Sequence, residues 1–374
     1  MNPVASRFLV VALLALGGCG PVALEGMALL GDIDAGFGPS RLKDETPAPI
    51  HAPVDYRVDG RARHGDLYLS PEGARGGLVL VPGVAEAGKD DPRLVALANS
   101  LARVRFAVLV PDITGLKQLR VRPADAVEIA DAMRWLGARA DLAPDGRLGA
   151  VAISYAVGPT LLAALEPAVG DSLRFLVALG GYYDMTALIT FFTTGYFRER
   201  GALRHMSPNA YGKWVFARSN LIHVADGRDR ALLDQMATRK MADLGADIAD
   251  LARELGGEGR AIHELLTNTE PDRVAGLIER LSPAMRADMT ALDPSARDLS
   301  ALKARLILIH GRADAIVPYT ESQALAAAVP QGQAALYLVD GLFHVDADLG
   351  WRDQFILLYA AIDLLEQRAP APAR

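Results

Sequence analysis

Short apolar runs alternate with segments of helical periodicity along most of this chain, and this alternation restricts the fold more than any other feature. The apolar runs are residues 77–81, 106–110, 148–153, 173–179, 305–309 and 335–339, and the helical segments are 91–104, 123–138, 154–165, 320–328 and 353–366. A run that is apolar at nearly every position is typical of a strand buried on both faces of a sheet. Strands that alternate with helices at this spacing predict an α/β fold with a mainly parallel sheet flanked by helices.

The alternation stops between residues 185 and 299, where almost every segment is helical or loop-like. An insertion of about 110 residues within an α/β core predicts a helical cap, placed before the strand at 305–309. The chain therefore divides into a first core part at 54–184, a cap at 185–299, a second core part at 300–368 and a tail at 369–374. The first third of the cap carries the aromatic residues Phe191, Phe192, Tyr196, Phe197, Trp214 and Phe216. They form either the cap's own core or part of an apolar pocket for an acyl group.

The N-terminus has the pattern of a secretory signal peptide. Arg7 precedes a short apolar run at 8–16, which is too short to span the roughly 30 Å of a bilayer core as a helix, and small residues follow it. Leu16-Gly17-Gly18-Cys19 resembles the lipobox of bacterial lipoproteins. That resemblance implies a signal peptide at 1–18 and a Cys19 that carries acyl chains such as palmitate. A plain secretory signal is the alternative.

A lipidated Cys19 would place the protein in the bacterial cell envelope, attached to a membrane. Stable attachment needs more than one acyl chain, because a single chain binds only marginally. The residue after Cys19 is Gly20 and not an aspartate, and in this respect the chain resembles lipoproteins that are sent on to the outer membrane. We expect residues 19–53, with several glycines and prolines, to form the lipidated N-terminus and a tether.

Composition excludes several classes of function. The net charge of −6 argues against a nucleic-acid partner. Cys19 is the only cysteine, so the mature protein has no thiol for a disulfide and no cysteine-rich zinc site. The seven histidines show no H-E-x-x-H spacing. We therefore expect a protein that works without a metal or cofactor.

Ser154 follows the apolar run at 148–153, and small residues then open a helical segment. This layout is that of a nucleophile elbow, a strained strand-to-helix turn that presents a serine hydroxyl at the end of a sheet. The local sequence is Ala152-Ile153-Ser154-Tyr155-Ala156, with alanines where the usual G-x-S-x-G pattern has glycines. The added methyl groups predict some strain in the turn.

A nucleophilic serine needs a general base, and the base needs an acid to orient it. Asp314 lies in the loop after the run at 305–309, and His344 lies in the loop after the run at 335–339. Catalytic groups of open α/β sheets collect beyond the carboxyl ends of strands, where Ser154 also lies.

These residues resemble the α/β-hydrolase fold family, over roughly residues 55–367. The order Ser, Asp, His is that family's order, the stretch His310 to Pro318 is similar to its H-G-x-x-D-x-x-V-P loop, and Gly341-Leu342-Phe343-His344 is similar to its histidine loop. The resemblance implies a triad of Ser154 as nucleophile, His344 as general base and Asp314 as orienting acid. Some relatives carry the acid after the preceding strand, which makes Asp184 the alternative.

The resemblance also implies an oxyanion hole made by backbone N–H groups. One donor would be Tyr155, directly after the nucleophile, and the other Val84, in the loop after the run at 77–81, with Ala85 as the alternative. The family often has His-Gly in that loop, whereas this chain has Pro82-Gly83.

The sequence thus predicts an envelope-anchored serine hydrolase, with carboxylesterase-like cleavage of a small-molecule or lipid ester. Thioesterase, lactonase, peptidase and haloperoxidase-like chemistry use the same triad, and fold does not choose among them. A non-catalytic binding or assembly protein on the same fold is the alternative from another class. No protein partner is indicated.

Overall fold

An eight-stranded sheet forms the centre of the structure, a computed structural model that describes residues 20–344 and 346–368. The strand order is β1-β2-β4-β3-β5-β6-β9-β10. The strands are β1 (Ile50–Val58), β2 (Arg61–Leu69), β3 (Gly76–Val81), β4 (Phe106–Pro111), β5 (Leu148–Ile153), β6 (Leu173–Leu179), β9 (Arg305–Gly311) and β10 (Ala334–Val339). Only the β1–β2 and β2–β4 pairs are antiparallel. The expected α/β fold with a mainly parallel sheet is confirmed.

Helices cover both faces of this sheet, which explains why its inner strands are apolar throughout. Every residue of β3 and of β4 is buried. One face packs against α6 (Pro123–Gly137), α7 (Val157–Ala164) and α16 (Thr320–Ala328), and the other against α4 (Pro92–Arg103) and α17 (Trp351–Glu366). Two short helices, α5 (Thr114–Lys117) and α8 (Pro167–Gly170), lie in the connections.

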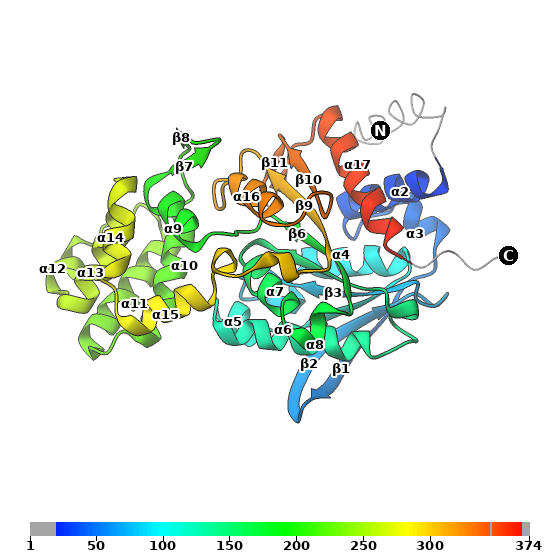
Figure 1. The fold of residues 1–374 in the computed structure, drawn as a ribbon, viewed down its shortest axis with the longest axis horizontal. Coiled ribbons are helices and arrows are strands. Elements are labelled where there is room, and N and C mark those ends of the chain that lie inside the picture. Colours follow the sequence, from blue (N-terminus) through cyan, green and yellow to red (C-terminus); the bar gives the residue numbers. More distant parts are fainter. Residues whose placement is uncertain (1–19, 345, 369–374) are drawn as a thin grey trace.

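Residues 21–45, which we expected to belong to a tether, form two helices that pack on the core. They are α2 (Pro21–Ala35) and α3 (Arg41–Glu45), beside α17 in Figure 1. Asp32 of α2 is buried and accepts hydrogen bonds from Ser100 of α4, at 2.7 Å, and from Lys43 and Ser40. Leu29 of α2 joins the apolar core under α4 and α17. These contacts fix the segment, since an unpaired buried carboxylate would be costly.

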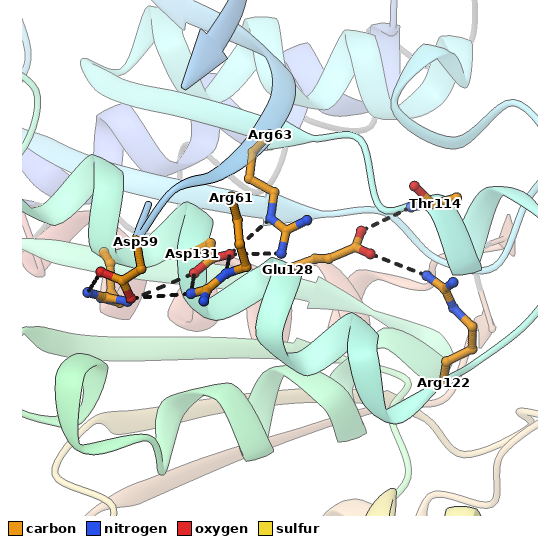
Figure 2. A network of polar contacts seen from close by, with 8 residues as sticks. Asp59, Arg61, Arg63, Thr114, Arg122, Glu128 and Asp131 are labelled. Carbon is orange, nitrogen blue, oxygen red and sulfur yellow. Dashed lines mark hydrogen bonds and ion pairs between the residues drawn. The ribbon is translucent and has the colours of Figure 1, made fainter. Parts of the chain in front are cut away.

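The β1–β2 hairpin at the edge of the sheet is held to α6 by charged side chains, and Figure 2 shows this network. Asp131 of α6 accepts two hydrogen bonds from Arg61, at 2.7 and 2.9 Å, and one from Arg63 at 2.9 Å. About one turn earlier in α6, Glu128 accepts a hydrogen bond from the backbone N–H of Thr114 at 3.2 Å. The two arginines hold the pKa of Asp131 below its ordinary value although burial alone would raise it.

We expect Asp131→Ala to lower the free energy of unfolding by about 1–3 kcal/mol, because it removes three charge-assisted hydrogen bonds at a buried carboxylate. Urea unfolding measures the change. Asp141→Ala is the matched control, since it removes an exposed pair with Arg139 that contributes little. Equal losses in the two variants would contradict the importance of the network.

The inserted segment forms a second, mostly helical unit beside one end of the sheet (Figure 1). Its helices are α9 (Met185–Thr194), α10 (Tyr211–Asn220), α11 (Gly227–Ala242), α12 (Ala249–Glu254), α13 (Gly257–Thr267), α14 (Val274–Glu279) and α15 (Pro283–Ala291). They share an apolar core of their own, to which Phe192 and Trp214 belong. A hairpin that the sequence did not indicate, β7 (Tyr196–Glu199) and β8 (Ala202–His205), follows α9. Within residues 20–344 and 346–368, no helix combines the length and apolarity needed to cross a membrane.

Candidate active site

Ser154 lies at the carboxyl end of β5, in a short 3-10 helix (Ser154–Ala156) that leads directly into α7. Its φ of 59° is in the left-handed region, which side chains rarely adopt and which marks a strained turn. Ala152 and Ala156 are fully buried in the core on either side of it. The sharp turn therefore forms with alanine at both positions, and the methyl groups are accommodated by packing.

Asp314 lies in the loop between β9 and α16 and is completely buried. Its Oδ1 accepts hydrogen bonds from the backbone N–H groups of Ile316, at 2.8 Å, and Val317, at 3.0 Å. Its Oδ2 accepts from Nδ1 of His344 at 2.7 Å and lies 3.4 Å from Nε2 of His310. Both oxygens of this carboxylate thus accept hydrogen bonds, which fix its orientation.

His310 supports the loop that carries Asp314 through both of its ring nitrogens. Its Nε2 donates to the carbonyl oxygen of Val317 at 2.9 Å, and its Nδ1 lies 2.7 Å from the hydroxyl of Ser322. The next residue is Gly311. A Cβ at this position would lie only 1.9 Å from the carbonyl oxygen of Leu342, so a residue with a side chain would not fit. This close approach places the loop that carries His344 against the loop that carries Asp314.

His344 lies in the turn between two very short strands, β11 (Leu342–Phe343) and β12 (Asp346–Ala347), with a φ of 61°. Asp353, in the first turn of α17, accepts hydrogen bonds from the backbone N–H groups of Asp340, at 2.9 Å, and Gly341, at 3.1 Å. These bonds hold the loop in place just before His344.

The three side chains form one hydrogen-bonded chain. Nε2 of His344 lies 2.8 Å from Oγ of Ser154, and Nδ1 lies 2.7 Å from Oδ2 of Asp314. A carboxylate only accepts, so Nδ1 carries the proton, and Nε2 of the neutral ring accepts the bond from the serine hydroxyl. The structure therefore brings together the three residues that the sequence selected, whereas Asp184 caps α9 by accepting from the N–H of Ala187.

Asp314 is ionised at neutral pH because of its neighbours. Burial raises its pKa, but the hydrogen bonds and charges of His310 and His344 outweigh that effect and hold the pKa well below the ordinary value of 3.8. A carboxylate in this state stabilises an imidazolium beside it.

The loop after β3 lies beside the serine, as an oxyanion hole would require. A Cβ on Gly83 would be 3.8 Å from Cβ of Ser154 and 3.5 Å from the carbonyl oxygen of Ile153. Val84 follows Gly83 in this loop, and Tyr155 follows Ser154 in the 3-10 helix. The backbone of both expected donors thus borders the serine.

Solved structures of other proteins resemble this fold. One protein, from Legionella pneumophila and itself only assigned as a hydrolase, has a TM-score of 0.59 and 14% sequence identity, over 94% of this chain and 96% of that one. The chain has the α/β-hydrolase fold. An α/β-hydrolase from a Penicillium species (TM-score 0.49, 16% identity, 85% of this chain and 99% of that one) and a dienelactone hydrolase from Anabaena variabilis (0.47, 14%, 87% and 100%) are less similar. No protein-family model and no curated protein matches the sequence.

The cap contacts the loop that carries Asp314 in this α/β-hydrolase fold. The N–H of Asn209 donates to the carbonyl oxygen of Ala315, next to Asp314, at 2.7 Å. Tyr211 follows Asn209 by two residues. Its pKa is raised by burial and by the charge of Glu86, which lies in the loop after β3. Asn209 thus ties the cap to the loop that carries Asp314, and the exposed fraction of Ser154 is only 7%.

A small cavity of about 50 Å³ lies between the cap and the turn after β5. Tyr155, Tyr182, Phe192 and Phe216 are among its lining residues, so the aromatic residues of the cap contribute both to its core and to this cavity. The volume admits one or a few water molecules rather than a long acyl chain. The Tyr155 hydroxyl is buried and has no hydrogen-bond partner among the described residues.

The two segments that join cap and core are fastened to each other, a feature that the sequence did not indicate. Oε2 of Glu321, in the first turn of α16, accepts from the backbone N–H groups of Tyr183, at 2.9 Å, and Asp184, at 2.8 Å. On the returning segment, the N–H of Ser295 donates to the carbonyl oxygen of Tyr183 at 3.1 Å. Burial raises the pKa of Glu321 to about 7, the nearby charges of Asp184 and Asp293 add to the rise, and the two backbone hydrogen bonds oppose it.

This carboxyl group makes stability depend on pH. The unfolded chain loses the proton near the ordinary value of 4.5, whereas the folded protein keeps it up to about pH 7, so the free energy of unfolding falls as the pH rises through this interval. Glu321→Gln stays neutral, and its stability relative to the unsubstituted protein should increase by up to about 1.4 kcal/mol per pH unit there. Urea unfolding across the interval measures this, with Glu279→Gln, at an exposed position, as control. The same pH dependence in both variants would contradict the assignment.

The remaining expectations concern metals and the anchor. Across the described residues, no group of three His, Cys, Asp or Glu side chains is placed to hold a metal ion. Cys19, the signal peptide at 1–18 and the tail at 369–374 lie outside the described residues.

Proposed function

We propose that this protein is a serine hydrolase that cleaves a carboxylic ester through an acyl-Ser154 intermediate. The observation that carries the proposal is the unbroken chain of hydrogen bonds from Ser154 to His344 to Asp314, with distances of 2.8 and 2.7 Å. A non-catalytic protein on this fold has no need to keep a base within reach of the serine, so this geometry favours catalysis.

In the proposed reaction, Oγ of Ser154 attacks the ester carbonyl carbon while Nε2 of His344 takes the hydroxyl proton. The backbone N–H groups of Tyr155 and Val84 stabilise the oxygen anion of the tetrahedral intermediate. When the intermediate collapses, the C–O bond breaks and Nε2–H protonates the departing alcohol. Water, deprotonated by Nε2, then attacks the acyl-serine and releases the carboxylic acid. Asp314 stabilises the imidazolium in both halves of the reaction.

A fluorophosphonate probe and a panel of p-nitrophenyl esters of graded chain length test this proposal. We expect covalent labelling at Ser154, located by peptide mass spectrometry, and hydrolysis of at least one ester. Protein that is folded by circular dichroism but is neither labelled nor active on esters, thioesters or lactones would support the non-catalytic alternative.

We also propose that the protein is attached to the bacterial envelope through acyl chains on Cys19, with the outer membrane as the destination. The support is the lipobox-like Leu16-Gly17-Gly18-Cys19 and the identity of Gly20. Cys19→Ser should abolish incorporation of labelled palmitate and remove the protein from the membrane fraction of cells. If Cys19→Ser incorporated no palmitate but stayed in the membrane fraction in unchanged amount, the proposed anchor would be contradicted.

A further inference from the structure

The first and last helices of the fold form one surface. Gly26 of α2 lets the two helices approach, because a Cβ there would lie 3.2 Å from the side chain of Leu358 and 3.6 Å from that of Ile362, both on α17. Just beyond the end of α17, Arg368 donates two hydrogen bonds to Glu25, at 2.6 and 2.7 Å. The start of α2 therefore packs against the end of α17.

This α2–α17 surface exposes several large apolar side chains. Leu24 on α2 is 42% exposed and Phe37, just after α2, is 67% exposed, whereas Ile33 (39%), nine residues after Leu24, lies on the other side of the helix. On α17, Trp351 and Tyr359 are 62% and 64% exposed. They lie eight residues apart with Phe355 between them, so the three aromatic side chains share one side of the helix.

A concentration of exposed apolar groups on two adjoining helices marks an interaction site. Tryptophan and tyrosine are favoured where one end of the side chain meets an apolar phase and the other end meets water, as at a membrane interface. The composition of the surface therefore fits a lipid bilayer.

The position of the surface along the chain identifies the same partner. α2 begins at Pro21, only two residues after Cys19, and two residues of extended chain reach about 7 Å at most. Acyl chains on Cys19 would thus hold α2 directly at the lipid headgroups, with no tether between them.

We propose that the α2–α17 surface rests on the bilayer that holds the acyl chains of Cys19; this inference depends on the proposed lipidation. The contact adds apolar area to the anchor and fixes the orientation of the protein. Arg147, directly before β5, donates to the carbonyl oxygen of Gln367 at 3.2 Å, so the end of α17 and the start of α2 lie at the amino ends of the strands. Ser154 lies at the opposite end of β5, about 20 Å away for a strand of this length, and Trp351, at the start of the 16-residue α17, also lies toward that end. The surface therefore runs along the side of the core.

Trp351 supplies the test. The chain has three tryptophans, Trp135, Trp214 and Trp351, and only Trp351 lies on this surface. The full chain, processed in cells and purified in detergent, is reconstituted in phosphatidylcholine vesicles with and without bromine on the acyl chains. Subtracting the spectrum of Trp351→Phe isolates the emission of Trp351. We expect brominated lipid to quench most of that emission, and Leu24→Asp combined with Phe37→Asp to restore it.

Ile222→Asp is the matched control, since Ile222 is 68% exposed but lies in the cap, and it should leave the quenching unchanged. Intact-mass spectrometry of the same sample reports separately whether Cys19 is acylated. Acylated protein whose Trp351 is not quenched would overturn the surface proposal and leave the anchor standing. A Trp351 shielded by dimerisation, seen by sedimentation in detergent and lost in Leu24→Asp, would overturn it in favour of a contact between two copies.

Discussion

The proposed ester hydrolysis is expected to fall by about 10⁴- to 10⁶-fold in the Ser154→Ala variant, because Ser154 is the nucleophile that would form the acyl intermediate. The hydroxyl is the only part of the hydrogen-bonded chain that reaches the substrate carbonyl. Its removal leaves the buried turn intact, since the methyl group of alanine occupies the place of Cβ and the flanking Ala152 and Ala156 are unchanged. The measurement is kcat/KM on the best p-nitrophenyl ester, together with a thermal unfolding curve.

Ser300→Ala serves as the control for this variant, since Ser300 is exposed in the connection before β9. It should keep full activity and full labelling by a fluorophosphonate. If Ser154→Ala retained more than a small fraction of the activity while remaining folded, the nucleophile would have to be another residue.

The second large effect is expected for Asp314→Asn, which should lower kcat about 10⁴-fold with little change in KM. The amide that replaces the carboxylate would donate to Nδ1 of His344, and the proton of the neutral ring would then move to Nε2. A protonated Nε2 cannot accept the hydroxyl proton of Ser154 across their 2.8 Å contact. The variant keeps the volume of the side chain, so a loss of rate reports the chemistry rather than the packing.

Asp184→Asn distinguishes this assignment from the alternative acid. Asp184 caps α9 through a side-chain oxygen, which asparagine keeps, and its bond to Glu321 is made by the backbone N–H, so Asp184→Asn should change neither stability nor kcat substantially. A greater loss of kcat in Asp184→Asn than in Asp314→Asn would reverse the two roles.

The sheet and the three central residues were predictable because each depends on local pattern. Ser154, Asp314 and His344 all follow a strand that is apolar at nearly every position, and this rule places their side chains at one edge of a parallel sheet. Gly311 and Gly341 belong to the motifs that resemble the α/β-hydrolase family, and the structure gives the reason for them, since backbones approach closely at both positions.

The features that escaped prediction depend on partners distant in sequence. The glycines of α2 led to the prediction of a tether. The structure shows instead that Gly26 allows a packed helix, because Leu358 and Ile362 lie close to it. Glu321 has the appearance of a surface residue in the first turn of a helix, yet it is buried by segments about 140 residues earlier. The β7–β8 hairpin has strands of four residues, too short for a periodic signal.

The packing of α2 on α17 has a consequence for the order in which the chain can fold. A helix near the start of the sequence finds its apolar partner only after the last helix has left the ribosome, so the N-terminal layer cannot be completed during synthesis. If the signal peptide predicted at residues 1–18 exports the chain in an unfolded state, this delay keeps the N-terminal layer open until export is complete. Removal of residues 351–374 should accordingly leave α2 accessible to limited proteolysis, whereas the intact protein should protect it.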